Sequence, residues 1–572
     1  MKGQEANTYD AIVIGTGISG GIAAMELCRK GLKTLVLERG REIKHGDYPT
    51  ANLDKWELPY NGQIPKEEQQ KDYPYLSRKG YIMEQGGIHH FVKDSEHPYT
   101  EEKRFDWIRA YQTGGRSLVW GRQSYQLSDL DFEANAREGI AIDWPIRHRD
   151  LKPWYDYVTR FVGVSGRAEG LAHFPDGPFQ PPMPLNCVEE KLRDGVHAVF
   201  PGRRVSEGRV AHLTAYDPAV NLGTRGNCQY RNRCRRGCPF GGYYSSNSGP
   251  LPVAEATGNM TLLPHAAVRE VIYDADKKRA AGVRVKMTQT GEEVEFFSKG
   301  VVFLCASALN SAAILLASKS TAQPNGLGND NDQVGRNVMD HHHSVGASGA
   351  MEGFENKYYK GRRPNGFYIP RFVNLGDQQT KRDYLRGFGY QGGGSRGGWQ
   401  HVVRELSVKP GADLKAALTQ PGGWSIGMAG FGECLPNPNN RITLNYDLLD
   451  KDGLPTLKMD VAFGDNEKAM RKDMEAYAVE MLEAAGAKNI KPFHREVFPG
   501  FAIHEMGTAR MGRDPKTSVL NKHNQVWNCQ NLYVTDGAAM TSASCVNPSL
   551  TYMALTARAV DHAVKALDRR DL

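Results

Sequence analysis

Apolar and small residues near the N-terminus fall into a strand, a turn, a helix and a second strand. Residues 11–14 are an unbroken apolar run, a glycine-rich segment follows at 15–21, and residues 34–37 form the second apolar run. Short unbroken apolar runs indicate strands that are buried on both faces, as in a parallel sheet covered by helices. The pattern therefore predicts a βαβ unit at the start of the chain.

Further strands and helices are predicted along the rest of the chain. Residues 300–305 form an apolar strand that runs into a small-residue helix. Between this strand and the C-terminus, the segments RITLNYD and LPTLKMDVAF indicate strands, and the stretch that starts at Asp465 has helical spacing. This mixture predicts an α/β protein, and its length allows two domains or one large one.

Composition narrows the class of protein. The 572 residues are 40% hydrophobic and 24% charged, with a formal net charge of +7, which is typical of a globular protein. The charge is mild and spread along the chain, so nucleic acid is not expected as a partner. No run of about 20 apolar residues predicts a direct membrane span, and the N-terminal residues lack an apolar signal core. The nine cysteines have no repeating framework and do not indicate a disulfide scaffold.

The glycine turn carries the first candidate chemistry. Gly15, Gly17 and Gly20 form G-x-G-x-x-G between the first strand and the helix, with Ser19 at the start of that helix, and Glu38 ends the second strand. These glycines allow a tight turn, close approach of the backbone to a pyrophosphate and close helix packing, and the acidic residue is placed to bind a ribose hydroxyl. The motif in this context predicts dinucleotide binding.

Three cysteines carry the second candidate chemistry. Cys228, Cys234 and Cys238 lie within NCQYRNRCRRGCPFGG, and the last one directly precedes Pro239. Thiolates suit zinc or iron–sulfur clusters, but the gaps of five and three residues fit paired zinc knuckles poorly. The trio alone leaves both metals open. The interleaved arginines are either a solvated loop or charges that compensate an anionic cluster or dock an acidic partner.

Four segments together resemble the glucose–methanol–choline (GMC) oxidoreductases, a family of FAD enzymes that act on alcohols and sugars. They are YQTGGRSLVWGRQSYQLSDLDF, GVVFLCASALNSAAILLASKS, VGRNVMDH and the C-terminal part with HEMGTARMG and LYVTDGAAMTSASCVNPSL. The resemblance implies a set of FAD-binding residues in the N-terminal glycine turn and the strand after it, in the strand at Val268, and in the first and last of these segments. They are Gly15, Gly17, Ser19, Gly20, Glu38, Gly114, Gly115, Ser117, Val268, Asp536, Gly537 and Asn547. Some relatives attach flavin covalently through a histidine in the loop that corresponds to Gly114 and Gly115. This chain has Arg116, Leu118, Val119 and Trp120 there, so we expect non-covalent FAD.

The resemblance also implies a catalytic pair, His504 and Asn547. Removal of hydride from a carbinol carbon requires that the hydroxyl proton depart, so a base must lie within hydrogen-bond reach of that oxygen. His504 suits the base, and Asn547 is able to donate to the same oxygen.

Within the GMC family, the cysteine trio resembles the catalytic subunits of bacterial FAD-dependent sugar dehydrogenase complexes, above all glucoside 3-dehydrogenase. This implies a [3Fe-4S] cluster on Cys228, Cys234 and Cys238, a small partner subunit with an export signal, and a cytochrome c or quinone acceptor. We therefore expect a periplasmic protein exported with its partner, with the cytoplasm as the alternative. Glucose 1-dehydrogenase, gluconate 2-dehydrogenase and fructose dehydrogenase remain alternatives, as do a GMC oxidase with structural zinc and a non-enzymatic electron-transfer flavoprotein.

The family pattern suggests a division into domains. We expect a discontinuous, Rossmann-like FAD-binding domain, a lid, an insertion with the cysteines, and a substrate domain with an antiparallel sheet backed by helices. The ranges are 1–45, 100–165, 255–340 and 500–572 for the first, then 46–99, 166–254 and 341–499 for the others.

Several other residues have weaker signals. His341, His342 and His343 resemble a metal tract, but adjacent side chains of extended backbone point to opposite faces, so we do not expect a metal there. Trp399, Trp424 and Tyr390 are either core residues or platforms for a sugar ring. Cys545 lies two residues before Asn547 and receives no role.

Overall fold

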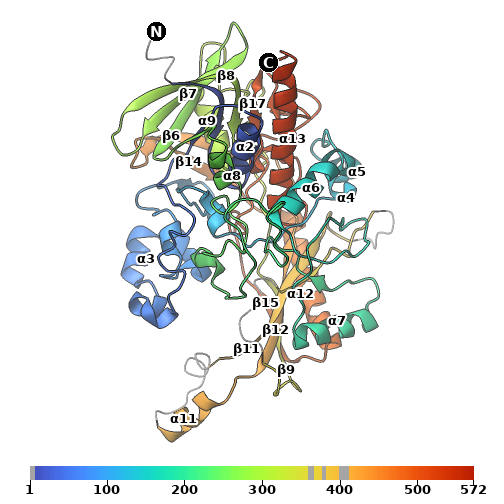
Figure 1. The fold of residues 1–572 in the computed structure, drawn as a ribbon. Helices are drawn as coiled ribbons and strands as arrows, with labels where there is room; N and C mark the ends of the chain where they lie inside the picture. Colours follow the sequence, from blue (N-terminus) through green and yellow to red (C-terminus); the bar gives the residue numbers. More distant parts are fainter. Residues whose placement is uncertain (1–6, 359–365, 377–381, 399–410) are drawn as a thin grey trace.

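The computed structural model describes residues 7–358, 366–376, 382–398 and 411–572. Its two main sheets lie in different parts of the molecule (Figure 1). Among the described residues, the two largest hydrophobic cores are built on these sheets, and the first core is the larger. The mixed α/β fold agrees with the fold class predicted from the sequence.

The larger sheet gathers strands from three distant parts of the chain. Its main path follows the order β16-β17-β8-β1-β2-β5, in which β17, β8, β1, β2 and β5 run parallel to one another and β16 is antiparallel to β17. The antiparallel hairpin of β6 and β7 joins it at β8. The strands are β1 (Thr8–Ile14), β2 (Thr34–Leu37), β5 (Met260–Leu263), β6 (Ala266–Asp274), β7 (Arg279–Met287), β8 (Glu293–Leu304), β16 (Gln525–Val526) and β17 (Cys529–Val534).

Helices cover this sheet through apolar faces. The helix α2 (Ile18–Arg29) packs against α13 (Ser549–Asp568), which in turn contacts α6 (His148–Val162) (Figure 1). On α13 the buried positions Leu550, Met553, Ala554 and Ala557 follow helical spacing and form one face. Together these contacts place the start of α2 beside the start of α13, where the candidate site lies.

The smaller core is built on a six-stranded antiparallel sheet in the order β15-β9-β12-β11-β10-β4. The helices α7 (Cys187–Val199) and α12 (Asp465–Ala484) cover it (Figure 1). The strands are β4 (Ser206–Glu207), β9 (Val345–Met351), β10 (Phe367–Ile369), β11 (Phe388–Arg396), β12 (Trp424–Gly432) and β15 (Lys488–His494).

Two strands predicted from the sequence lie outside this sheet. RITLNYD and LPTLKMDVAF become β13 (Arg441–Leu449) and β14 (Pro455–Asp460), which pair with each other and with β3 (Thr100–Glu101). The six-stranded sheet takes β4 from residues 166–254 instead. Pairing between distant segments decides this arrangement, and the segments' own patterns do not reveal it. The domain boundaries proposed above stay predictions.

The remaining described segments are mostly short turns of helix. Within residues 46–99 the longest is α3 (Lys66–Asp72), which stands to one side of the main body (Figure 1). Among the described residues, none of the helices combines the length and apolar character needed to cross a membrane.

Candidate functional site

The glycine turn after β1 opens onto a cavity of about 1060 Å³ that is lined by residues from both halves of the molecule. Gly15 has φ +96°, and a Cβ there would lie 2.5 Å from a backbone carbonyl oxygen of the segment after β8. A Cβ on Gly20 would lie 1.8 Å from the Gly15 carbonyl oxygen, so this glycine lets α2 pack closely on the turn. A Cβ on Gly17 would meet no protein atom within 4 Å. Space for a ligand therefore lies directly over the Gly17 backbone.

Glu38 is buried at the end of β2 beside this turn. Its carboxylate accepts hydrogen bonds from the Thr16 hydroxyl, from the Thr16 backbone nitrogen at 3.3 Å and from the Gly40 nitrogen at 2.9 Å. Burial raises the pKa of Glu38, and these hydrogen bonds act against that shift. The Thr16 hydroxyl also accepts from the Gly114 nitrogen at 2.9 Å, so it links the two glycine segments. Our sequence analysis missed Thr16, because it occupies a variable position of the motif.

The second glycine pair forms a left-handed turn. Gly114 has φ +86° and Gly115 has φ +49°, and the Ser117 hydroxyl donates to the Gly114 carbonyl oxygen at 2.6 Å. Gly115 and Ser117 line the cavity. The turn therefore brings this loop against the Gly15–Gly20 turn, as the family resemblance implies.

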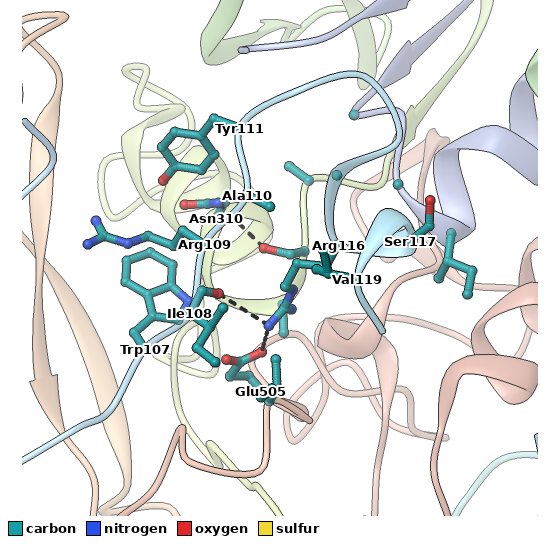
Figure 2. A pocket seen from close by; sticks show the side chains of 18 of the residues that line it. Trp107, Ile108, Arg109, Ala110, Tyr111, Arg116, Ser117, Val119, Asn310 and Glu505 are labelled. Atoms are coloured by element: carbon teal, nitrogen blue, oxygen red, sulfur yellow. Dashed lines mark hydrogen bonds and ion pairs between the residues drawn. The ribbon is translucent and has the colours of Figure 1, made fainter. Parts of the chain in front are cut away.

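Arg116 lies between these two residues and extends along the cavity (Figure 2). Its guanidinium pairs with Glu505 at 2.7 Å and donates to the Ile108 carbonyl oxygen at 3.4 Å. Burial acts against the charge, but the Glu505 carboxylate outweighs it, and the pKa of Arg116 is raised. The cavity thus keeps a positive charge, paired with Glu505, beside the Gly114–Gly115 turn.

The segment after β17 supplies the last predicted cofactor residues. Asp536 accepts a hydrogen bond from the Ser311 hydroxyl at 2.6 Å and from the Ala538 nitrogen at 2.9 Å, and burial raises the pKa of Asp536 to about 6. A Cβ on Gly537 would lie 2.5 Å from the Glu505 carbonyl oxygen, so only glycine fits there.

The structure brings most of the predicted cofactor residues to one cavity. Gly20 and Gly114 do not line it and act on the backbone around it. The cofactor residues that line it are Gly15, Gly17, Ser19, Glu38, Gly115, Ser117, Val268, Asp536, Gly537 and Asn547.

His504 and Asn547 meet in the same cavity. The Asn547 amide nitrogen lies 3.3 Å from His504 Nε2, and the Gln391 side-chain nitrogen donates to Asn547 Oδ1 at 2.7 Å. Gln391 comes from β11, so the smaller sheet contributes directly to the site. Our sequence analysis missed Gln391, because only the sheet pairing shows that it faces the cavity.

Burial lowers the pKa of His504 well below its usual range. Neighbouring groups add to this lowering of the pKa when they are protonated, namely His341, His343, Arg116 and Lys79. A neutral His504 imidazole at ordinary pH is able to accept a proton.

The backbone around His504 is held by a buried carboxylate. Asp340 accepts from the Ala502 nitrogen at 3.1 Å and from the His504 nitrogen at 3.0 Å. Ile503, between them, has φ +69°, which is rare for a β-branched residue and marks a strained segment. The buried Lys79 side chain donates to the Gly500 carbonyl oxygen in the same turn.

The histidine tract has a role that differs from metal binding. His341 contacts His504, with the two Nδ1 atoms 2.7 Å apart, and His343 lines the cavity beside Phe431. His342 turns toward Gly432 and Phe463 instead. This alternation agrees with the expectation that the three side chains do not share one ion.

The cysteine segment borders one end of the cavity. Residues 232–236, including Cys234, line it, whereas Cys228 and Cys238 do not. The Cys234 sulfur lies 3.7 Å from Nε2 of the buried His212. Burial raises the pKa of Cys228 to about 11, and the charges of Cys234 and Cys238 contribute to this shift.

The spacing of these sulfurs bears on the choice of metal. Among the described residues, three ligand atoms of His, Cys, Asp or Glu come within 4.8 Å of one another only at His97, Asp450 and Asp452. A single zinc ion, with Zn–S distances of about 2.3 Å, needs its sulfur ligands roughly 4 Å apart. The cysteine trio is therefore not preformed for a single ion.

The His97 group already holds a cation. The Arg39 guanidinium contacts both carboxylates, lies 3.3 Å from the His97 ring and stacks 4.5 Å from the centre of the Tyr111 ring. A protein charge thus occupies the position that a metal would take.

The arginines around the cysteines bind the neighbouring excursion of the chain. Arg231 donates to the Ala51 carbonyl oxygen at 2.6 Å, Arg233 to the Asn52 carbonyl oxygen at 2.8 Å, and Arg235 to the Tyr81 carbonyl oxygen at 3.2 Å. These contacts tie the stretch to the excursion, while Arg235 itself remains exposed. Their cause is tertiary, because residues 51–54 and 81 are distant in the sequence.

The other candidates are core residues or lie outside the described residues. Trp424 and Tyr390 are buried, and the Tyr390 hydroxyl donates to the Met474 carbonyl oxygen at 2.7 Å. Neither lines the cavity. Cys545 is buried away from the cavity lining, and Trp399 lies outside the described residues.

Comparison with known proteins decides the family. Two sequence models, both described as GMC oxidoreductase, match residues 216–343 and 436–556. Over these two segments the chain matches the GMC oxidoreductase family. It is 28% identical to 2-methyl-1,2-propanediol dehydrogenase of Mycolicibacterium austroafricanum, over 97% of this chain and 95% of that protein. It is 24% identical to the fructose dehydrogenase large subunit of Gluconobacter japonicus, over 97% and 98%.

A solved structure confirms the GMC fold. Aspergillus oryzae formate oxidase superposes with a TM-score of 0.60 over 99% of both chains, at 13% identity. FAD binding is expected from this family, and GMC oxidoreductases act on alcohols and sugars.

Proposed function

We propose that this GMC oxidoreductase is an FAD-dependent dehydrogenase that oxidises a secondary hydroxyl of a sugar or glycoside, preferably the C3 hydroxyl of a pyranoside to a 3-keto group. The observation that carries the proposal is the position of His504 and Asn547. Their side chains lie 3.3 Å apart in the cavity that the dinucleotide turn also lines.

The residues around the cavity fit FAD. Open space lies over Gly17, where a pyrophosphate would approach the backbone, and the buried Glu38 carboxylate lies where a ribose hydroxyl would bind. Val268 and Asp536 line the same space. FAD, when bound, supplies the acceptor for a hydride and is able to release electrons singly. With Arg116 in the flavin loop, we expect the FAD to be non-covalent.

The chain's own contribution is to remove and hold a proton. His504 is neutral at ordinary pH, because burial lowers its pKa, so Nε2 is able to take the proton of the substrate hydroxyl. The Asn547 amide nitrogen is placed to donate to the same oxygen. The positive charge of Arg116 lies beside the flavin loop and favours anionic charge in the cavity.

The names of the relatives support a substrate with hydroxyls on neighbouring carbons. A 1,2-propanediol and fructose both have this feature, and so does the C3 position of a pyranoside. The Gln391 and Asn547 amides offer polar atoms for a second hydroxyl. Glucose oxidised at C1, gluconate at C2 and fructose remain the alternative substrates.

We further propose a [3Fe-4S] cluster on Cys228, Cys234 and Cys238 as the exit for single electrons. Cys234 supports this role, because it lines the same cavity as His504. One relative is described as a large subunit, which supports a small partner subunit for this chain. With that partner we propose export to the periplasm and a cytochrome c or quinone acceptor. Exposed aromatic residues beside the cysteines offer a contact surface for such a partner, namely Trp56, Tyr60, Tyr230 and Phe240.

Two experiments test these proposals separately. Protein purified without air is mixed with methyl α-glucoside, glucose, gluconate, fructose and 2-methyl-1,2-propanediol, and flavin bleaching is recorded. The preferred reaction is supported if methyl α-glucoside bleaches the flavin fastest of the five compounds and yields a 3-keto product. It is refuted if none of the five bleaches the flavin. Iron and sulfide analysis with electron paramagnetic resonance tests the cluster. Zinc without iron would support the alternative of an oxidase with structural zinc, and flavin without any reaction would support an electron-transfer flavoprotein.

A further inference from the structure

We propose that His341 and Gln391 are positioning residues that fix the proton of neutral His504 on Nδ1 and leave Nε2 unprotonated, so that Nε2 is the base. The inference rests on the proposed function and deepens it. It is carried by a continuous chain of hydrogen bonds through the Ser544 carbonyl, His341, His504, Asn547 and Gln391.

The Ser544 end of this hydrogen-bond chain sets the direction of its hydrogen bonds. His341 Nε2 lies 2.7 Å from the Ser544 carbonyl oxygen, and a carbonyl oxygen only accepts. His341 therefore carries its proton on Nε2, and Nδ1 of the neutral ring is an acceptor. Because this Nδ1 lies 2.7 Å from His504 Nδ1, His504 must be the donor in that hydrogen bond. A neutral His504 then has no proton on Nε2.

The outer end requires the same assignment. Gln391 donates its side-chain nitrogen to Asn547 Oδ1 at 2.7 Å, which turns the Asn547 nitrogen toward His504 Nε2. An amide nitrogen only donates, so Nε2 must accept. If the Asn547 amide were reversed, its oxygen would require a proton on Nε2, which contradicts the arrangement at His341. Only one placement of the protons satisfies both ends.

The surroundings hold this chain in place. Ser544 has φ +58°, an unusual conformation for a serine, and its hydroxyl donates to Asp131 Oδ1 at 2.8 Å. The His341 ring is 1% exposed and meets the His504 ring edge to face, at 83° and 4.9 Å between centres. Strained backbone that presents a carbonyl to a buried ring is consistent with a positioning role.

The choice of a neutral acceptor has a chemical consequence. A carboxylate beside Nδ1 would favour the charged imidazolium and raise the pKa of His504, whereas the neutral His341 ring orients His504 without doing so. After Nε2 takes the substrate proton, the Nδ1–H stays bonded to His341. The base therefore keeps its orientation in both protonation states.

The test compares variants of the full FAD-loaded chain on the substrate that bleaches wild-type flavin fastest among the five named above. His341→Leu removes the acceptor, and His341→Asn keeps a side-chain oxygen that is able to accept from His504. We expect His341→Leu to lower kcat about 100-fold with KM changed less than about threefold, and His341→Asn to recover at least about tenfold. His342→Leu is the matched control, because His342 is buried next to His341 but faces Gly432.

Several outcomes would overturn the inference. The first is a kcat of His341→Leu within about threefold of wild type. The second is a kcat of His341→Asn as low as that of His341→Leu, at equal FAD content and melting temperature. The third is a loss of kcat in His342→Leu equal to that in His341→Leu. If His341→Leu does not hold FAD, Gln391→Leu tests the outer end of the hydrogen-bond chain, with an expected loss in kcat of about tenfold. Gln391→Asn should not restore kcat, because the asparagine side chain is too short to reach Asn547. Full activity of His504→Ala would instead refute the proposed base, which separates the two failures.

Discussion

The same added methyl group is expected to act in opposite ways at two glycines of the nucleotide turn. Gly17 has φ −65°, which any residue adopts, and its Cβ would meet no atom within 4 Å. Gly17→Ala should therefore stabilise the FAD-free fold by about 0.4–1 kcal/mol, because the unfolded chain loses freedom. A Cβ on Gly20 would lie 1.8 Å from the Gly15 carbonyl oxygen, so Gly20→Ala forces the backbone apart and should destabilise the fold by about 1–3 kcal/mol or more.

The effect on FAD separates the two roles further. The methyl group of Gly17→Ala would occupy the space over the backbone where the pyrophosphate approaches. Loss of one hydrogen bond to a charged group costs about 1.5–3 kcal/mol, which corresponds to FAD binding weaker by roughly 10-fold to 150-fold.

Fluorescence titration of FAD-free protein with FAD gives the Kd of each variant, and thermal melting without FAD gives the stability. Unchanged FAD affinity in Gly17→Ala would refute the assignment of this space to the cofactor. A Gly17→Ala protein that melts as early as Gly20→Ala would refute the steric argument.

Three further predictions concern the rest of the site. Because burial lowers the pKa of His504, kcat/KM should stay constant as the pH falls from 8 to below about 6.5, the usual pKa of histidine. A pH–rate profile in which kcat/KM falls with a midpoint near pH 7 would contradict this. Arg116→Met should lower the melting temperature, because it leaves the Glu505 side chain, which is 1% exposed, without its partner; the expected loss in the free energy of unfolding is about 3–5 kcal/mol. The double variant with Glu505→Gln should recover most of this stability. If Arg116→Met melts like the wild type, the ion pair does not stabilise the site. Cys234→Ser should lower the iron content of anaerobically purified protein while the flavin content stays unchanged, and full iron retention would remove Cys234 from the proposed ligands.

The local chemistry of the site could be predicted from the sequence. The glycine turn, Glu38 and the strands on either side are consecutive in the chain, so their spacing alone specifies a βαβ unit. The family segments likewise identified His504 and Asn547, which the structure places 3.3 Å apart. The sequence pattern predicted the strands β13 and β14 but not their partners, because pairing joins distant segments. These strands form a small sheet of their own with β3.

The sequence by itself therefore determined the nucleotide turn, the family and the candidate base, because each depends on short segments whose residue types and spacing have direct physical meaning. Only the tertiary structure decided how that base is oriented. His341, Gln391 and Ser544 lie far apart in the chain and meet through the packing of two sheets. Hydrogen-bond direction depends on which polar atoms face each other in three dimensions, and the order of residues along the chain does not contain that information.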